Sequence, residues 1–156
     1  MNNQDNKFSQ AETCILMEPM HANIHGHVHG GELMRLMDNT AGIAAAKHAK
    51  GAVVTARVDE LEFHSPVLIG DIVTCIAQLC YVGNSSMQIW VSVYVNNLSD
   101  ASEMKLALSA FFTMVHLKDK VVARVEPLHP SSPLEHKLYA LGEAKYLEIK
   151  AKRKRQ

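Results

Sequence analysis

The chain has 156 residues, 47% of them hydrophobic and 21% charged, with a formal net charge of zero. This length suits one domain with its own core, and the neutral charge argues against a nucleic-acid binder, because such proteins bind largely by neutralising phosphates. No apolar run approaches the roughly 20 residues of a membrane span, and the polar start lacks the apolar stretch of a signal peptide. The three cysteines include no C-x-x-C pair. We therefore expect a cytoplasmic protein with reduced thiols and no nucleic-acid or membrane partner.

The first part of the chain predicts one long helix after a polar loop. Residues 1–11 are predicted to be disordered, 13–17 to form a short strand and 18–31 to form the loop. Between about Glu32 and His48 the apolar residues recur with a period of 3.6, which predicts a helix. The second half of this helix is almost all alanine and glycine, so that a sheet can approach its backbone closely.

The middle of the chain predicts consecutive strands, of which 54–63, 72–82, 87–96 and 106–117 are the four long ones. The apolar phase changes after Glu60, which predicts a bulge near Asp59, and Gly83-Asn84 marks a turn. A last helix begins near Leu134 after three prolines. Because short turns join the strands, we predict an α+β fold in which an antiparallel sheet wraps around one long central helix.

Asp38 lies inside the predicted central helix among small and apolar residues. A carboxylate in such a place is costly to bury unless a partner pairs with it or a reaction uses it. Gly30-Gly31 open the helix, so that its first N–H groups can face an anion or an oxyanion. Asp38 is thus a candidate base; as the alternative, it is a surface acid paired with Arg35 or His48.

The loop before the helix carries alternating histidines at His25, His27 and His29. In an extended loop these three imidazoles would share one side and could hold zinc with an open position. Asn23 in the same loop is either an Asx-turn residue or a functional amide with both a donor and an acceptor. From the residues alone, these alternatives stay open.

Several motifs together resemble one known family. They include N-x-x-G-x-V-H-G-G at 23–31, L-M-D at 36–38, A-G-I-A-A at 41–45, F-H-S-P at 63–66, G-D-I-V at 70–73 and V-G-N-S-S-M at 82–87. This combination resembles the hotdog-fold acyl-CoA thioesterases, in particular the bacterial acyl-CoA hydrolases of the YciA type and the animal brain-type or cytosolic acyl-CoA hydrolases. The resemblance covers roughly residues 12–118, which it implies are a hotdog domain. Residues 119–156 form a C-terminal extension with a helix and a basic tail and match no motif.

The resemblance implies hydrolysis of acyl-CoA to a free carboxylic acid and CoA, in fatty acid metabolism. Asp38 would act as general base or nucleophile, and Asn23 would orient the water or the thioester. The family's sites lie between two subunits, which supply the asparagine and the aspartate separately. Family members form dimers and often trimers of dimers, so we expect a homo-oligomer, with a hexamer as the fullest form.

Further site residues are expected from the same resemblance. Gly30 and Gly31 would donate N–H groups to the oxyanion, and His29 would cap or pack beside them and the substrate. Contacts with the CoA part of the substrate are expected from Arg57, His64, Ser65, Gly83, Asn84, Ser85 and Ser86. The family uses no metal here, and we expect no cofactor, since CoA belongs to substrate and product. The basic tail is expected to be solvated and frayed.

Two alternative functions stay open from the sequence. One is a hotdog module that binds acyl-CoA without cleaving it. The other is a hotdog dehydratase acting on acyl-carrier protein, in which His29 would be the catalytic histidine. Chain-length preference and nucleotide regulation have no signal in the sequence.

Overall fold

The computed structural model describes residues 7–156, apart from the side chains of residues 101 and 102. Strands, helices and one short 3-10 helix (η2) follow each other as β1 (Gln10–Leu16), η2 (Pro19–His21), α1 (Gly30–Ala49), β2 (Ala52–Phe63), β3 (Ile72–Val82), β4 (Ser86–Asn97), β5 (Asp100–Lys118), β6 (Val121–Val122) and α2 (Pro133–Lys154). The helix predicted over 32–48 and the four long strands are confirmed. β3 has the predicted bounds, α1, β2 and β4 extend one or two residues further, and β5 begins six residues before the predicted start.

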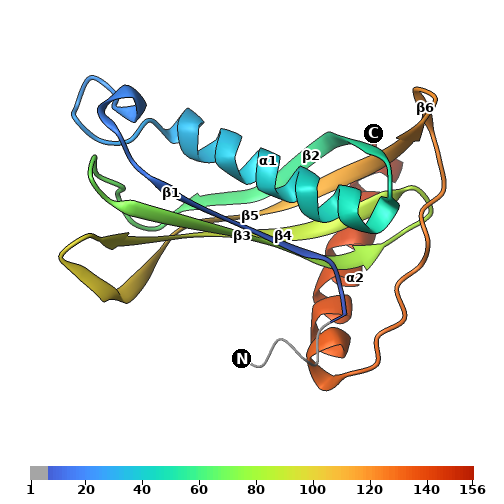
Figure 1. The fold of residues 1–156 in the computed structure, drawn as a ribbon. Coiled ribbons are helices and arrows are strands. Elements are labelled where there is room, and N and C mark those ends of the chain that lie inside the picture. Colours follow the sequence, from blue (N-terminus) through green and yellow to red (C-terminus); the bar gives the residue numbers. More distant parts are fainter. Residues whose placement is uncertain (1–6) are drawn as a thin grey trace.

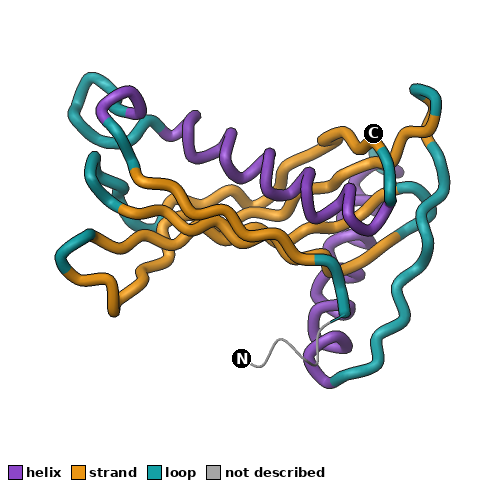
Figure 2. The backbone as a smooth tube through the Cα atoms, in the orientation of Figure 1, coloured by secondary structure: helices purple, strands orange, loops and turns teal. Residues whose placement is uncertain are grey.

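All strand pairs are antiparallel, and the sheet has the order β1-β3-β4-β5-β2 with β6 added to β5. The helix α1 lies along one face of this sheet, and α2 packs against the other (Figure 1). This is the hotdog arrangement that the sequence predicted. Loops gather at the two ends of the sheet (Figure 2), which places the loop before α1 far from the β3–β4 turn.

The alanine-rich face of α1 explains how closely the helix packs. Met37, Ala41, Ala44 and Ala45 have no exposed surface, and their short side chains leave room for the inward-pointing valines, leucines and isoleucines of β3 and β4. Thr40, also fully buried, satisfies its hydroxyl on the Leu36 carbonyl at 2.7 Å. The small residues therefore set the distance between helix and sheet.

The strand β2 contains the bulge that its apolar phase predicted. The register with β5 shifts between Asp59 and Glu62, and Glu60 has a φ of 53°, a left-handed conformation that is uncommon for a residue with a side chain. Lys145 of α2 donates hydrogen bonds to Glu60 and, at 2.8 Å, to Glu148. Burial alone would lower the pKa of Lys145, but these bonds outweigh it and raise the pKa. The bulge is thus fastened to α2 by a buried ammonium.

The helix α2 approaches the sheet most closely at Gly142. A Cβ at this position would lie 2.6 Å from the Tyr81 Cβ and 2.7 Å from the Cys80 Cβ, so that only glycine fits. Tyr81 packs between Tyr139 and Tyr146, with ring centroids 5.1 Å and 5.0 Å away. The basic end of the chain continues this helix to Lys154, so the expectation of a frayed tail was wrong, although its side chains are exposed.

The start of the described chain is also held by α2. Glu135 is fully buried and accepts hydrogen bonds from the Lys7 N–H and from the N–H and hydroxyl of Ser131. Phe8 is buried as well, and β1 begins at Gln10. The predicted disorder of 1–11 is therefore wrong for the residues from Phe8 onward, and 1–6 lie outside the described residues. Among the described residues, no helix combines the length and hydropathy needed to cross a membrane.

We expect Glu135→Ala to lower the free energy of unfolding by about 2–3 kcal/mol, because it leaves buried donors without an acceptor. The measurement is urea unfolding followed by circular dichroism. The matched control is Glu126→Ala, an exposed residue whose change should stay within about 0.5 kcal/mol. Equal losses in the two variants would contradict the role of Glu135.

Candidate active site

Asp38 lies half-buried on the side of α1 that faces β2. The Thr55 hydroxyl of β2 donates a hydrogen bond to the Asp38 Oδ1, and the same hydroxyl lies 3.4 Å from the Met114 Sδ of the neighbouring strand β5. The partners that the sequence offered as alternatives are elsewhere. Within the described residues Arg35 forms no ion pair, and the His48 Nε2 bonds to the Glu126 carbonyl at 2.7 Å. Asp38 is thus a carboxylate oriented by a hydroxyl, with no cation to neutralise it.

Thr55 is the residue of this pair that the sequence analysis missed. A threonine in a strand is ordinary, because β-branched residues favour strands. The available signal was the position of Thr55 in the V-V-T-A motif. Successive side chains of a strand point to opposite faces of the sheet, so a threonine one position later would point its hydroxyl away from α1.

The Asn23 side chain shapes the loop before α1. Its Oδ1 accepts from the backbone N–H groups of His25 at 2.9 Å and His27 at 3.2 Å. The backbone N–H of Asn23 donates to the His27 carbonyl at 2.7 Å. Gly26 closes the turn with a φ of 77°. Because the amide oxygen is used twice by the loop, the Nδ2 group is the part of Asn23 left to contact a substrate, and it can only donate.

His29 is the N-cap of α1, as the sequence analysis expected of its side chain. Its Nδ1 accepts from the Gly31 N–H at 3.0 Å, and its carbonyl accepts from Glu32 and Leu33. No acceptor for the Gly30 N–H occurs among the described residues. Of the two glycines predicted as oxyanion donors, Gly30 therefore has its N–H available in this structure and Gly31 has its N–H engaged.

Within one protomer, the helix start with Gly30 lies apart from Asp38, although the predicted site needs both. Asp38 follows Gly30 by eight positions of the helix, which corresponds to about 12 Å along the axis. A single water molecule cannot bridge that span. Beside Asp38, the edge strand β2 and α1 expose apolar side chains that a monomer would leave in water: Met34, Val54, Val58 and Phe63.

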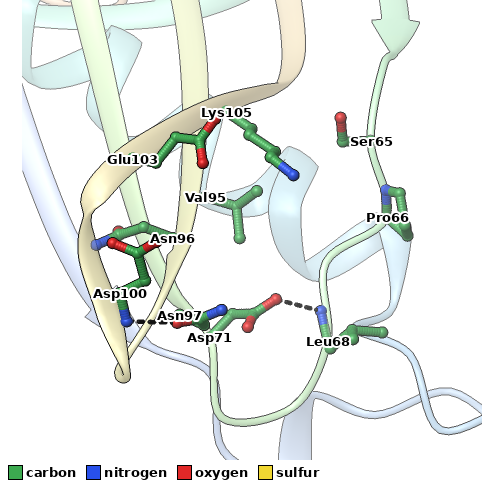
Figure 3. A pocket seen from close by; sticks show the side chains of 10 residues that line it. All are labelled: Ser65, Pro66, Leu68, Asp71, Val95, Asn96, Asn97, Asp100, Glu103 and Lys105. Carbon is green, nitrogen blue, oxygen red and sulfur yellow. Dashed lines mark hydrogen bonds between the residues drawn. The ribbon is translucent and has the colours of Figure 1, made fainter.

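His64 and Ser65, two of the residues expected to contact CoA, lie at the end of the sheet where the loop before α1 is found. His64 bonds through Nε2 to the Ser109 hydroxyl at 2.9 Å. Ser65 borders an open cavity of about 300 Å³ between the β2–β3 connection and the β4–β5 hairpin (Figure 3). Asp71, Asp100 and Glu103 also line this cavity, which makes it a poor place for phosphates. Arg57, further along β2, directs its Nε to both Asp59 carboxylate oxygens, at 2.9 and 2.8 Å.

The predicted turn at 83–86 lies at the opposite end of the sheet, beside the last turns of α2. Asn84, Ser85 and Ser86 border a groove of about 220 Å³ with Lys150 and Arg153. No carboxylate lines this groove, so its field is positive. The structure therefore brings this turn together with the basic tail and not with the Asn23 loop of the same chain.

Candidate metal ligands and reactive groups include His25, His27 and His29 in the loop before α1, and the buried Cys75 and Cys80. In the part of the chain that the structure describes, no cluster of three or more His, Cys, Asp or Glu side chains is placed to hold a metal ion. Burial raises the pKa of the Cys75 thiol to about 11 and that of Cys80 to about 12, so both stay protonated at neutral pH.

Comparison with known proteins identifies the family. Residues 25–99 match the model of the thioesterase superfamily. The fold superposes on the acyl-CoA hydrolase of Staphylococcus aureus, solved with butyryl coenzyme A, coenzyme A and coenzyme A disulfide, with a TM-score of 0.84 and 31% identity over 94% of this chain and 89% of that one. The chain belongs to the hotdog-fold acyl-CoA thioesterases.

Other members of this family differ in length or assembly. The human cytosolic acyl coenzyme A thioester hydrolase is 39% identical over 94% of this chain, but the match spans only 39% of the human protein. A hexameric acyl-CoA thioesterase superposes with a TM-score of 0.85 and 30% identity over 94% of each chain. This chain thus spans less than half of the human relative and nearly all of the hexameric one.

Proposed function

We propose that this chain is a cytoplasmic acyl-CoA thioesterase that hydrolyses acyl-CoA to a free carboxylic acid and CoA. The observation that carries the proposal is the Asp38 carboxylate held by the Thr55 hydroxyl beside an unpaired sheet edge, in a chain of this family. The cytosolic human relative supports the location.

The S. aureus enzyme supports these residue assignments. It has been solved with an asparagine, an aspartate and a threonine replaced in turn by alanine. Those three residues are separated along that chain by the same numbers of residues that separate Asn23, Asp38 and Thr55 here. A correspondence of the loop, the helix and the edge strand in the two chains predicts this equal spacing, which therefore supports the assignment.

Asp38 supplies the base in the proposed reaction. Thr55 occupies Oδ1, so the other carboxylate oxygen can take a proton from water as the water oxygen attacks the thioester carbonyl carbon. The carbon–sulfur bond then breaks, and the CoA thiolate receives the proton. In the second route the carboxylate attacks the carbonyl itself and water resolves the anhydride; both routes use the same oxygen.

Asn23 and the N-terminus of α1 supply the hydrogen-bond donors of the proposed site. The Asn23 Nδ2 and the Gly30 N–H are donors without an acceptor in the loop's own hydrogen bonds, so they suit the negative charge that develops on the thioester oxygen. The Asn23 side chain is held by the backbone N–H groups of His25 and His27, and Gly30 is held in the first turn of α1. Little reorganisation is therefore needed when substrate binds.

Two protomers together complete the site in this proposal. Asn23 and Gly30 of one subunit meet Asp38 of another across the β2 edges, whose exposed apolar side chains become buried. Trimers of such dimers are proposed from the hexameric relatives. No metal is needed, because a thioester is already an activated acyl group and these donors polarise it.

The two alternatives have weaker support. A dehydratase would need the His29 imidazole as its base, but the Nδ1 of His29 is occupied by the Gly31 N–H. A pure binding module has no use for a carboxylate oriented by a hydroxyl at its site.

Thiol release from a panel of acyl-CoA thioesters tests the function. We expect turnover by the wild type and a loss of about 10²–10⁴ in Asp38→Asn. Asn23→Asp keeps an oxygen for the loop but replaces the donor with a negatively charged oxygen beside the oxyanion, so we expect a loss of at least about 10²–10³. The control is Glu32→Gln, another carboxylate on α1. Absence of thiol release with every wild-type assay would refute the function, and near-normal turnover by Asp38→Asn would refute the residue assignment.

The shared site is tested by mixing two inactive variants. Asn23→Ala and Asp38→Ala subunits should regain up to about a quarter of wild-type activity after exchange, because half of the dimers are hybrids with one intact site. Native mass spectrometry confirms the exchange. Hybrids that form and stay inactive would show that each site uses a single chain.

Thr55→Val keeps the shape of the side chain and removes the hydroxyl. We expect kcat to fall about 10- to 100-fold with little change in KM, since the carboxylate loses its orientation. Thr55→Ser, the matched control, should keep most of the activity. Equal loss in the serine and valine variants would point to packing as the role of Thr55.

The basic groove is proposed to bind the phosphates of CoA. The double variant Lys150→Glu/Arg153→Glu should raise KM for acyl-CoA about tenfold and leave the hydrolysis of acyl-pantetheine, which lacks the nucleotide, unchanged. Lys154→Glu reverses one charge outside the groove and, compared with each single variant, serves as control. An unaltered KM for acyl-CoA would remove the groove from the substrate site.

A further inference from the structure

His29 alone accepts hydrogen bonds from most of the backbone N–H groups in the first turn of α1. Its Nδ1 takes the Gly31 N–H at 3.0 Å, and its carbonyl takes the N–H groups of Glu32 at 2.9 Å and Leu33 at 3.4 Å. The backbone N–H of His29 donates to the His21 carbonyl at 2.7 Å. The Gly30 N–H, the remaining donor of this turn, has no acceptor among the described residues. The fit is tight, since a Cβ on Gly31 would lie 3.2 Å from the His29 Nδ1.

The cap requires one particular form of the imidazole. A nitrogen that accepts an N–H bond carries a lone pair, so Nδ1 is unprotonated and the proton of the neutral ring is on Nε2. Protonated imidazole carries N–H on both nitrogens. It would direct Nδ1–H at the Gly31 N–H and add positive charge at the positive end of the helix dipole. Serine, threonine, aspartate and asparagine, the usual N-caps, have no such sensitivity near neutral pH.

Charged groups around the cap do not compensate for a positive ring. The elements packed around it contribute Glu18 and His21 from the η2 segment, His25 and His27 from the loop, Glu32 and Arg35 from α1, and Glu62, His64 and Asp71 from the β2–β3 region. Within the described residues none of these forms an ion pair with His29. The His21 Nδ1 is itself an acceptor, for the Glu18 N–H at 2.9 Å, so a second imidazole of this loop also needs its neutral form.

We infer that His29 is a positioning residue of the active site: its neutral Nε2–H form engages the Gly31 N–H, directs the Gly30 N–H at the substrate oxyanion, and loses this function when the ring is protonated. This inference rests on the proposed thioesterase function. The hydrolysis rate then falls in mild acid, because a protonated Nδ1 carries an N–H and can no longer accept the Gly31 N–H.

The test is the pH profile of kcat/KM with an acyl-pantetheine substrate, which has no phosphate that titrates in this range. We expect wild-type activity to fall about tenfold between pH 8 and pH 5.5. His29→Asn and His29→Ser keep a capping oxygen, so they should keep at least about half of the pH 8 activity and be nearly flat over this range. His29→Phe keeps a ring without an acceptor and should lose about 10- to 100-fold at both pH values, mainly in kcat. The loop control His25→Asn should retain the wild-type profile.

A second readout is independent of turnover. Nitrogen-15 spectra of the imidazoles at pH 8 should show His29 protonated on Nε2 only, and the Gly31 amide should exchange more slowly in the wild type than in His29→Phe. A ring protonated on Nδ1 at pH 8 would overturn the inference, and so would an acid loss that persists in both His29→Asn and His29→Ser. If the wild type hydrolyses no thioester, the proposed function fails, while the spectra still decide whether the imidazole is the cap.

Discussion

The close contact between the alanine face of α1 and the sheet is the constraint on which the remaining structure depends. With Ala41, Ala44 and Ala45 fully buried, the helix axis sits near enough to β5 and β2 for a threonine on an edge strand to reach a carboxylate on the helix. Larger side chains at these positions would move α1 outward and separate Asp38 from Thr55. The same small side chains therefore set both the packing of the core and the orientation of the Asp38 carboxylate.

The outer face of the sheet shows the opposite solution. There the buried side chains include Gln88, Ser92, Ser109 and Thr113, and α2 covers part of them with charged groups that have their own partners. Hydrogen bonds from Lys145 and Lys152 lower the pKa of Glu148 from 4.5 to about 2. Burial would raise the pKa of Glu135, but the bonds from Lys7 and Ser131 outweigh it and lower the pKa. The α1 face is held by close apolar packing, whereas the α2 face combines aromatic packing around Tyr81 with paired polar groups.

The sequence predicts much of the fold because its local signals agree with one another. The helical period of α1, the alternation along β4 and the phase change near Asp59 each specify an element without tertiary information. The start of β1 was missed because its order depends on a contact between Lys7 and Glu135, residues far apart in the sequence. At the site, Asp38 and Asn23 were found through motifs, whereas the Thr55 hydroxyl and the acceptor role of the Asn23 oxygen depend on how separate segments meet, which no pattern records.

The exposed end of α2 has a practical consequence for experiments with this protein. The groove that holds Lys150 and Arg153 lies within the last turns of the helix. A fluorophore or a surface-coupling group attached to an exposed side chain of these turns would lie beside a positively charged groove, and an acidic one would compete with any anion for it. Labels for binding assays therefore belong on the tip of the β4–β5 hairpin at the opposite end of the sheet (Figure 1), where Leu98 is 66% exposed.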